Sequence, residues 1–171
     1  PWSLRFTVFL TAALLLAGVA RLLRPARLGV VGWDDGARRR LRALGALAPV
    51  QADGAVFGEE ERAGFAFLKR DRVWLALGDP AGDRQDAISA IWRFRDACER
   101  EGVDPAFWRV GPDLLRVYED IGLTAVPLAA PGEEAKHFLA CRAERDLQAL
   151  RQLLPPALQR ELPPERRSAA A

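Results

Sequence analysis

The chain has 171 residues, enough for one domain of ordinary size, and half of them are hydrophobic, which excludes a disordered chain. Its formal net charge of +2 is too small to indicate nucleic-acid binding by itself, and its two cysteines exclude a disulfide framework and fit a reducing compartment. The sequence contains no methionine and begins at Pro1, so we expect it to be part of a longer chain. Arginine far outnumbers lysine, which suggests a GC-rich bacterial genome.

The first predicted element is an apolar segment from Phe6 to Ala20 that carries no charged residue. A spanning helix needs about 20 apolar residues, slightly more than this segment supplies. Arg21, Arg24 and Arg27 follow it, and positive charge on one flank indicates the cytoplasmic side. We therefore expect residues 1–24 to form a transmembrane helix in the bacterial inner membrane, with the remainder in the cytoplasm. A signal peptide and a buried helix of a globular domain are the alternatives, although the segment has no polar face.

Residues 25–54 are expected to form a basic linker, over residues 25–32, followed by a helix, and residues 49–60 are expected to form a loop. Asp34 or Asp35 can cap a helix that runs to about Leu47, because apolar residues recur at helical spacing over this stretch. Placed just inside a membrane, its arginines would attract anionic phospholipid headgroups, and they could also meet tRNA phosphates. The alternative is that these arginines only set the orientation of the membrane helix and bind no ligand. This basic cluster comprises Arg24, Arg27, Arg38, Arg39, Arg40 and Arg42.

Residues 55–130 alternate between predicted strands and helices. Strands are expected at residues 63–68 and 73–77 as a hairpin, at 106–110, and at 123–128, where Pro127 favours the edge of a sheet. A helix is expected at residues 86–101, with Ala87, Ile91, Phe94 and Cys98 as its buried stripe and Gly102 at its end. A second helix is expected from Pro112 to Ile121. The alternation, together with the hairpin, predicts an α/β fold with a mixed β-sheet flanked by helices. Residues 131–171 are expected to be a helical tail broken by prolines, with one amphipathic helix over residues 144–154.

The turn from Gly78 to Gly82 leads from a strand into a helix, where backbone amides can bind a phosphate. Gly78 and Asp79 are therefore candidate anion-binding residues, although the carboxylate of Asp79 favours a simple helix entry instead. Arg93 and Arg95 on the following helix are candidates for an acidic substrate. The alternative is a solvated charged face, and Arg95 is also placed to pair with Glu99.

The sequence gives little sign of a metal, a cofactor or a nucleophilic catalyst. No glycine-rich nucleotide-binding motif, P-loop or acetyl-CoA pyrophosphate loop is present, so no cofactor is expected. His137 and Cys141 have a spacing that would suit a metal on a helix, yet they lack the further ligands of a zinc site even if Cys98 joins them. The catalytic residues stay unassigned.

Four segments together resemble one enzyme family. They are the strand ending Leu77-Gly78-Asp79-Pro80, the helix with Trp92-Arg93-Phe94-Arg95, the strand Ala106-Phe107-Trp108-Arg109-Val110, and the helix ending Ile121-Gly122-Leu123. This pattern, over roughly residues 55–128, is similar to the cytoplasmic domain of phosphatidylglycerol lysyltransferases, also called aminoacyl-phosphatidylglycerol synthases. A transmembrane helix just upstream is also the arrangement of that family.

The resemblance implies an acyltransferase fold of two tandem GNAT-type lobes, of which this chain would hold mainly the first. It implies transfer of lysine or another amino acid from aminoacyl-tRNA to phosphatidylglycerol, which makes the membrane surface less negative and resists cationic antimicrobial peptides. The chain is then expected to be an incomplete copy of such an enzyme. The alternative is a GNAT-like module that binds lipid or a partner without catalysis.

Overall fold

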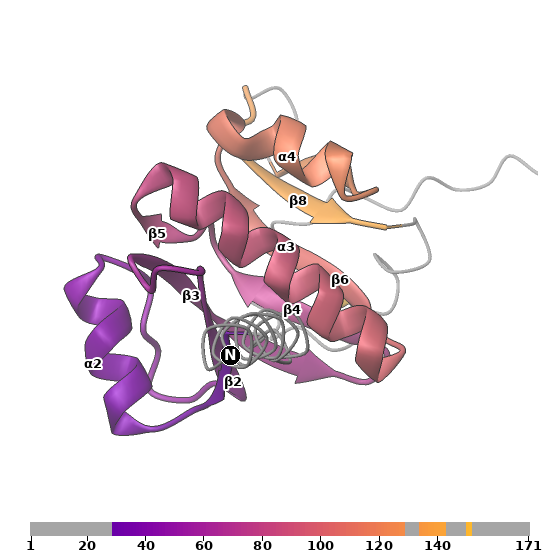
Figure 1. Ribbon diagram of the computed structural model, residues 1–171. Coiled ribbons are helices and arrows are strands. Elements are labelled where there is room, and N and C mark those ends of the chain that lie inside the picture. Colours follow the sequence, from indigo (N-terminus) through magenta and orange to yellow (C-terminus); the bar gives the residue numbers. More distant parts are fainter. Residues whose placement is uncertain (1–28, 129–133, 143–149, 152–171) are drawn as a thin grey trace, which may run out of the picture.

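The computed structural model describes residues 29–128, 134–142 and 150–151 (Figure 1). The predicted transmembrane helix of residues 1–24 and most of the predicted tail helix lie outside these ranges. Within them, no helix has the length and apolar character needed to cross a bilayer. The strands are β1 (Val30–Gly32), β2 (Gly54–Phe57), β3 (Ala63–Arg70), β4 (Val73–Leu77), β5 (Ala81–Gly82), β6 (Asp104–Val110), β7 (Thr124–Leu128) and β8 (His137–Cys141).

Three α-helices and one short 3₁₀ turn connect the described strands. Together with the sheet they give the mixed α/β fold that the sequence predicts. The helical elements are α2 (Asp35–Ala43), α3 (Arg84–Glu101), η1 (Pro112–Leu114) and α4 (Leu115–Asp120).

The strands form one eight-stranded sheet in the order β1-β2-β3-β4-β6-β8-β7, with the two-residue β5 paired to β3. Strands β4 and β6 run parallel and are joined through α3, whereas the other pairs in the described sheet are antiparallel. The hairpin of β3 and β4 confirms the predicted one. Strand β7 lies at the edge of this sheet, as the proline at position 127 predicts.

The sheet is covered on both faces. Because side chains alternate along a strand, Phe65 and Phe67 of β3 pack against Phe94 of α3, whereas Ala66 faces Leu41 of α2. Helices α3 and α4 thus lie on one face, where they run in front of the strands in Figure 1, and α2 lies on the other. The predicted buried stripe of α3 is confirmed, since its members, Ala87, Ile91, Phe94 and Cys98, are all buried.

Capping explains where the two longest helices begin and end. Asp34 accepts a hydrogen bond from the amide of Ala37 at 2.6 Å and starts α2. This helix ends at Ala43, earlier than the predicted Leu47, because the amide of Ala46 turns back to the carbonyl of Leu41 at 2.9 Å. Helix α3 ends at Gly102 in the left-handed conformation, as predicted.

Four strands are absent from the prediction: β1, β2, β8 and the two-residue β5, which lies in the predicted turn of residues 78–82. The linker of residues 25–32 contains β1, and the predicted loop of residues 49–60 contains β2. All four residues of β2 are buried, because it pairs on both sides and is covered on both faces, so it shows no alternation of polar and apolar residues. Strand β8 lies between β6 and β7, so the sheet extends beyond the predicted lobe of residues 55–130 in both directions.

Candidate functional site

Asp79 follows β4, at the carboxyl end of the parallel strand pair where ligands often bind in α/β sheets. Gly78 before it has φ +104, a conformation that glycine adopts without strain. One carboxylate oxygen of Asp79 accepts a hydrogen bond from the amide of Gly111 at 2.6 Å, and the other from the hydroxyl of Tyr118 at 2.7 Å. The Asp79 carboxylate therefore ties β4 to the start of η1 and to α4.

The hydroxyl of Tyr118 has a strongly raised pKa. Burial is the main cause, and the negative charge of Asp79 together with their hydrogen bond adds to it. Because the folded-state pKa lies above the ordinary value, this tyrosine stabilises the fold fully below about pH 10 and progressively less as the pH rises further. Burial likewise raises the pKa of the Cys98 thiol, so part of any alkaline destabilisation belongs to Cys98.

A titration tests this arrangement, because Tyr118 is the single tyrosine of the chain. We expect no tyrosinate absorbance at alkaline pH until the chain unfolds. The variant Tyr118→Phe should lose about 1–2 kcal/mol of unfolding free energy at neutral pH and show a weaker decline above about pH 10. Ionisation of Tyr118 with an ordinary midpoint in the folded chain would contradict the buried hydrogen bond to Asp79.

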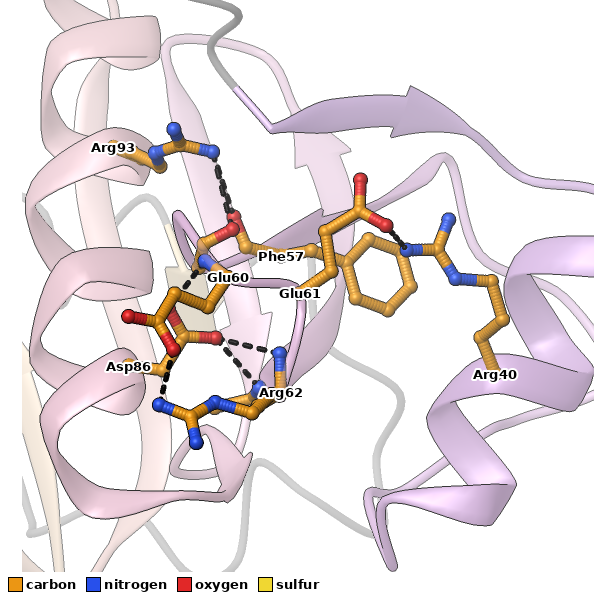
Figure 2. A network of polar contacts seen from close by, with 9 residues as sticks. Arg40, Phe57, Glu60, Glu61, Arg62, Asp86 and Arg93 are labelled. Carbon is orange, nitrogen blue, oxygen red and sulfur yellow. Dashed lines mark hydrogen bonds and ion pairs between the residues drawn. The ribbon is translucent and has the colours of Figure 1, made fainter.

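A second carboxylate, Asp86 in the first turn of α3, holds the loop between β2 and β3 (Figure 2). It is buried, and its two oxygens accept hydrogen bonds from the amides of Glu60 at 2.9 Å, Arg62 at 2.7 Å and Ala63 at 2.9 Å. Gly58 packs directly on this carboxylate, because a Cβ there would overlap the Asp86 side chain. The loop of residues 58–62 is therefore fixed against the N-terminal end of α3.

Asp86 is the principal residue that the sequence interpretation missed. A signal was present, because Asp83 and Asp86 stand three apart at a helix start. Asp83 caps α3 by accepting from the amide of Asp86 at 3.0 Å. The N-terminus of α3 thus holds two carboxylates of its own, and the anion site at Gly78 and Asp79 stays a prediction.

The two predicted arginines of α3 have different surroundings. Arg93 donates to the carbonyl of Gly58 at 3.1 Å and, more weakly, to that of Phe57 at 3.5 Å, so it holds the same loop as Asp86 (Figure 2). Arg95 pairs with Glu99 at 2.7 Å, as the sequence spacing predicts, and lies over the ring of Trp92. The structure does not bring Arg95 to the loop that Arg93 contacts.

Arg40 of α2 reaches the other side of this loop. Its guanidinium pairs with Glu61 at 2.5 Å and lies 4.0 Å from the ring centroid of Phe57, and Figure 2 shows the two contacts together. Arg40 therefore links α2 to the β2–β3 loop. Its positive charge is offset by Glu61, which leaves the rest of the α2 arginines to provide the basic surface.

The remaining described arginines of the predicted basic cluster are Arg38, Arg39 and Arg42 of α2, of which Arg39 and Arg42 are three residues apart on its exposed side. Arg39 and Arg42 are exposed, and neither has an acidic partner among the described residues. Arg38 is half-buried, and its Nε lacks a hydrogen-bond acceptor. The cluster is thus a positive surface on the sheet face opposite α3. Arg24 and Arg27 lie outside the described residues.

The two residues whose spacing would suit a metal on a helix lie on a strand instead. His137 and Cys141 lie on β8, with His137 exposed and Cys141 buried.

Arg109 has φ +56 where the β6–β8 pairing is irregular, a conformation that is unusual for a residue with a side chain. It lies near the carboxyl end of β6, close in sequence to the Gly111 amide that Asp79 holds.

Comparisons with known proteins identify relatives. Residues 37–135 match the family model described as phosphatidylglycerol lysyltransferase, C-terminal. A solved structure of the C-terminal domain of a protein described as a lysylphosphatidylglycerol synthetase, from Agrobacterium fabrum, is 34% identical over 43% of this chain and 23% of that chain, with a TM-score of 0.42. The structure of L-PGS from Bacillus licheniformis is 22% identical over 57% of this chain and 33% of that chain, with a TM-score of 0.50.

At 22% identity, the likeness to the Bacillus licheniformis structure concerns the fold alone. The chain spans a third or less of the length of each of these two solved chains. No curated protein gave a significant match.

Proposed function

Because the chain belongs to the family of phosphatidylglycerol lysyltransferase C-terminal domains, we propose that it is one lobe of an enzyme that transfers an amino acid from aminoacyl-tRNA to phosphatidylglycerol. The family match over residues 37–135 carries the proposal, since it spans the elements from α2 to β7. The lobe is of the GNAT acyltransferase type, and the mixed sheet with one parallel strand pair joined by α3 supports this. The amino acid is of the lysine type.

The location proposed for this lobe is the inner face of the bacterial cell membrane. Residues 1–24 anchor it there, because they combine an apolar segment with arginines on one flank. The phospholipid and the tRNA are both anionic. The positive surface of Arg38, Arg39 and Arg42 supports an encounter with either of them, because the described residues provide no acidic partner for Arg39 or Arg42.

In the proposed reaction, a hydroxyl oxygen of the phosphatidylglycerol headgroup attacks the ester carbonyl that joins the amino acid to the tRNA. A new ester bond forms to the lipid, the ester bond to the tRNA ribose breaks, and the hydroxyl proton passes to the released ribose oxygen. The protein contributes by positioning the two substrates and stabilising the oxyanion. The candidate positioning groups are Arg93, Arg95 and the turn of Gly78 and Asp79.

A second candidate is a GNAT-like module that binds lipid or a partner without catalysis. The specific observation in its favour is that the carboxylates near the carboxyl end of β4 and the start of α3 are engaged in the fold. Asp79 accepts two hydrogen bonds, Asp83 accepts one as the cap of α3, and Asp86 accepts three, so they are not free to act as a general base in this arrangement.

A transfer assay separates the two candidates. The full chain is incubated with radiolabelled lysyl-tRNA and vesicles that contain phosphatidylglycerol, and lipid-extractable label is counted against a reaction without protein. The catalytic proposal expects lipid-soluble label that depends on phosphatidylglycerol. Binding to these vesicles without any label in the lipid would overturn the catalytic proposal in favour of the binding module.

A further inference from the structure

Arg109 holds its backbone in a conformation that its residue type disfavours. Among the described residues, the non-glycine residues with positive φ are Glu61, Asp71 and Arg109. Asp71 lies in the turn between β3 and β4, where tight hairpins require positive φ, and aspartate tolerates it better than most residues. Glu61 lies in the loop that Asp86 holds, and it pairs with Arg40. Arg109 lies within the range of a strand, where no turn requires this conformation.

The β6–β8 pairing shows what the conformation does. Residues 107 and 110 of β6 pair with two β8 residues that are only two positions apart, so Trp108 and Arg109 stand opposite the single residue Leu139. Because of this β-bulge, Phe107 and Val110 both face the core under α3, while Trp108 packs in the core on the other face of the sheet. Arg109 is thus the extra residue of the bulge, and it is exposed.

Two adjacent residues at this position lower the stability of the fold. Glycine would form the same bulge without conformational cost, because it adopts positive φ as readily as negative φ, yet the chain has an arginine there. Trp108 is only 4% exposed, and its indole N–H has no hydrogen-bond acceptor. Both residues lie at the carboxyl end of the parallel pair of β4 and β6, where ligands often bind in α/β sheets. Backbone strain and unsatisfied buried donors gather at functional sites.

The residues that follow Arg109 are firmly held. The amide of Gly111 donates to the carboxylate of Asp79 at 2.6 Å, and the carbonyl of Asp113 accepts from the guanidinium of Arg84 at 3.2 Å. The start of η1 is therefore tied both to the turn after β4 and to the first residue of α3. An unfavourable backbone conformation persists only where its surroundings are fixed in this way.

The hydrogen-bonding groups at the end of β6 favour an anion that accepts hydrogen bonds. A guanidinium and an indole N–H can only donate, and the guanidinium matches the geometry of a phosphate group. The charges nearby are mixed, because the acidic residues Asp79 and Asp113 accompany the arginines at this end of the sheet. Mixed charge suits a single phosphate group better than RNA, which needs several cations along its backbone. In the proposed reaction, the substrate with a single phosphodiester is phosphatidylglycerol.

We propose that Arg109 binds the phosphodiester of the phosphatidylglycerol headgroup, and that the bulge serves to present its side chain at the end of β6. An arginine whose backbone is already fixed loses less conformational freedom when the phosphate arrives, so the strain contributes to binding. The inference rests on the proposed function and adds which residue of this lobe holds the lipid substrate.

A headgroup titration followed by nuclear magnetic resonance tests this role of Arg109. The full isotope-labelled chain in a zwitterionic detergent is titrated with glycerophosphoglycerol, which is the soluble headgroup of phosphatidylglycerol, and in parallel with inorganic phosphate and with glycerol. The signals followed are the backbone amide of Gly111 and the indole N–H of Trp108, which the variant Trp108→Phe assigns. We expect both signals to shift with glycerophosphoglycerol, to shift less with inorganic phosphate, and not to shift with glycerol.

Arg109→Gly and Asp71→Gly form a matched pair of variants, because each replaces a residue of positive φ by glycine. Neither should lower the urea midpoint of unfolding, whereas only Arg109→Gly should weaken headgroup binding, by about tenfold or more. The proposal is overturned if the unsubstituted chain does not bind the headgroup, if inorganic phosphate binds equally well, or if both variants bind alike. A large loss of stability in Arg109→Gly alone would overturn it too, because the arginine would then serve the fold.

The transfer assay on phosphatidylglycerol vesicles keeps this inference apart from the catalytic proposal. Transfer activity in a chain whose signals do not respond to the headgroup removes only the role of Arg109. Headgroup binding that depends on Arg109, without any transfer, removes only the catalytic proposal.

Discussion

Replacing Asp86 with alanine is expected to lower the free energy of unfolding by about 3–5 kcal/mol. The substitution removes the carboxylate that accepts hydrogen bonds from the amides of Glu60, Arg62 and Ala63, and the amide of Ala63 is buried. Each buried donor left without an acceptor costs about 1–3 kcal/mol, less where water can reach it. The variant Asp86→Asn retains one acceptor oxygen and should lose about half as much. Urea unfolding followed by circular dichroism measures each difference.

Two acidic residues of the same helix provide controls for Asp86. Asp83→Ala removes only the N-cap bond and should cost about 1 kcal/mol. Asp96→Ala removes an exposed carboxylate whose ion pair with Arg95 is 3.9 Å long, and it should change stability by less than about 0.5 kcal/mol. If Asp86→Ala were no worse than Asp83→Ala, the carboxylate would not hold the β2–β3 loop as described.

Phe94→Ala is expected to destabilise the chain by about 3–5 kcal/mol, because Phe94 is fully buried at the centre of the core between α3 and the sheet. Its ring lies 5.3 Å from that of Phe65 and 5.3 Å from that of Phe107, both in edge-to-face geometry, and 5.4 Å from that of Phe67. The substitution would leave a cavity that rigid strands on the other side cannot fill. Urea unfolding followed by circular dichroism again measures the change.

Trp92→Ala is the matched control for Phe94→Ala, since it removes a larger ring two residues away on the same helix. Trp92 is 38% exposed and contacts Arg95 through a cation–π interaction at 5.3 Å, so its loss should cost at most about 1 kcal/mol. Similar losses for both substitutions would mean that the face of α3 toward the sheet is not the one described here.

The surroundings of the candidate site residues follow only partly from the sequence. Gly78, Asp79 and Arg93 were chosen for their local context, but the partners of Asp79 and Arg93 lie more than 30 residues away in the sequence. Spacing along the chain cannot reveal such partners. Those of Asp79 meet it only when the parallel pairing of β4 and β6 brings η1 and α4 beside the turn, and Arg93 meets Gly58 only when α3 packs against the β2–β3 loop. The Arg95 pairing with Glu99 was predictable, because one turn of helix is sufficient to form it.

The sequence by itself determined the mixed α/β class, the hairpin, the buried stripe of α3 and the family, because these depend on local periodicity, capping and short motifs. The tertiary structure decided the rest. Strands β1, β2 and β8 are strands because neighbours in the sheet satisfy their backbone groups, and their short sequences carry no period of their own. Asp86 is buried because a loop from elsewhere in the chain supplies three amide donors, and a carboxylate loses its hydration only where such donors replace water.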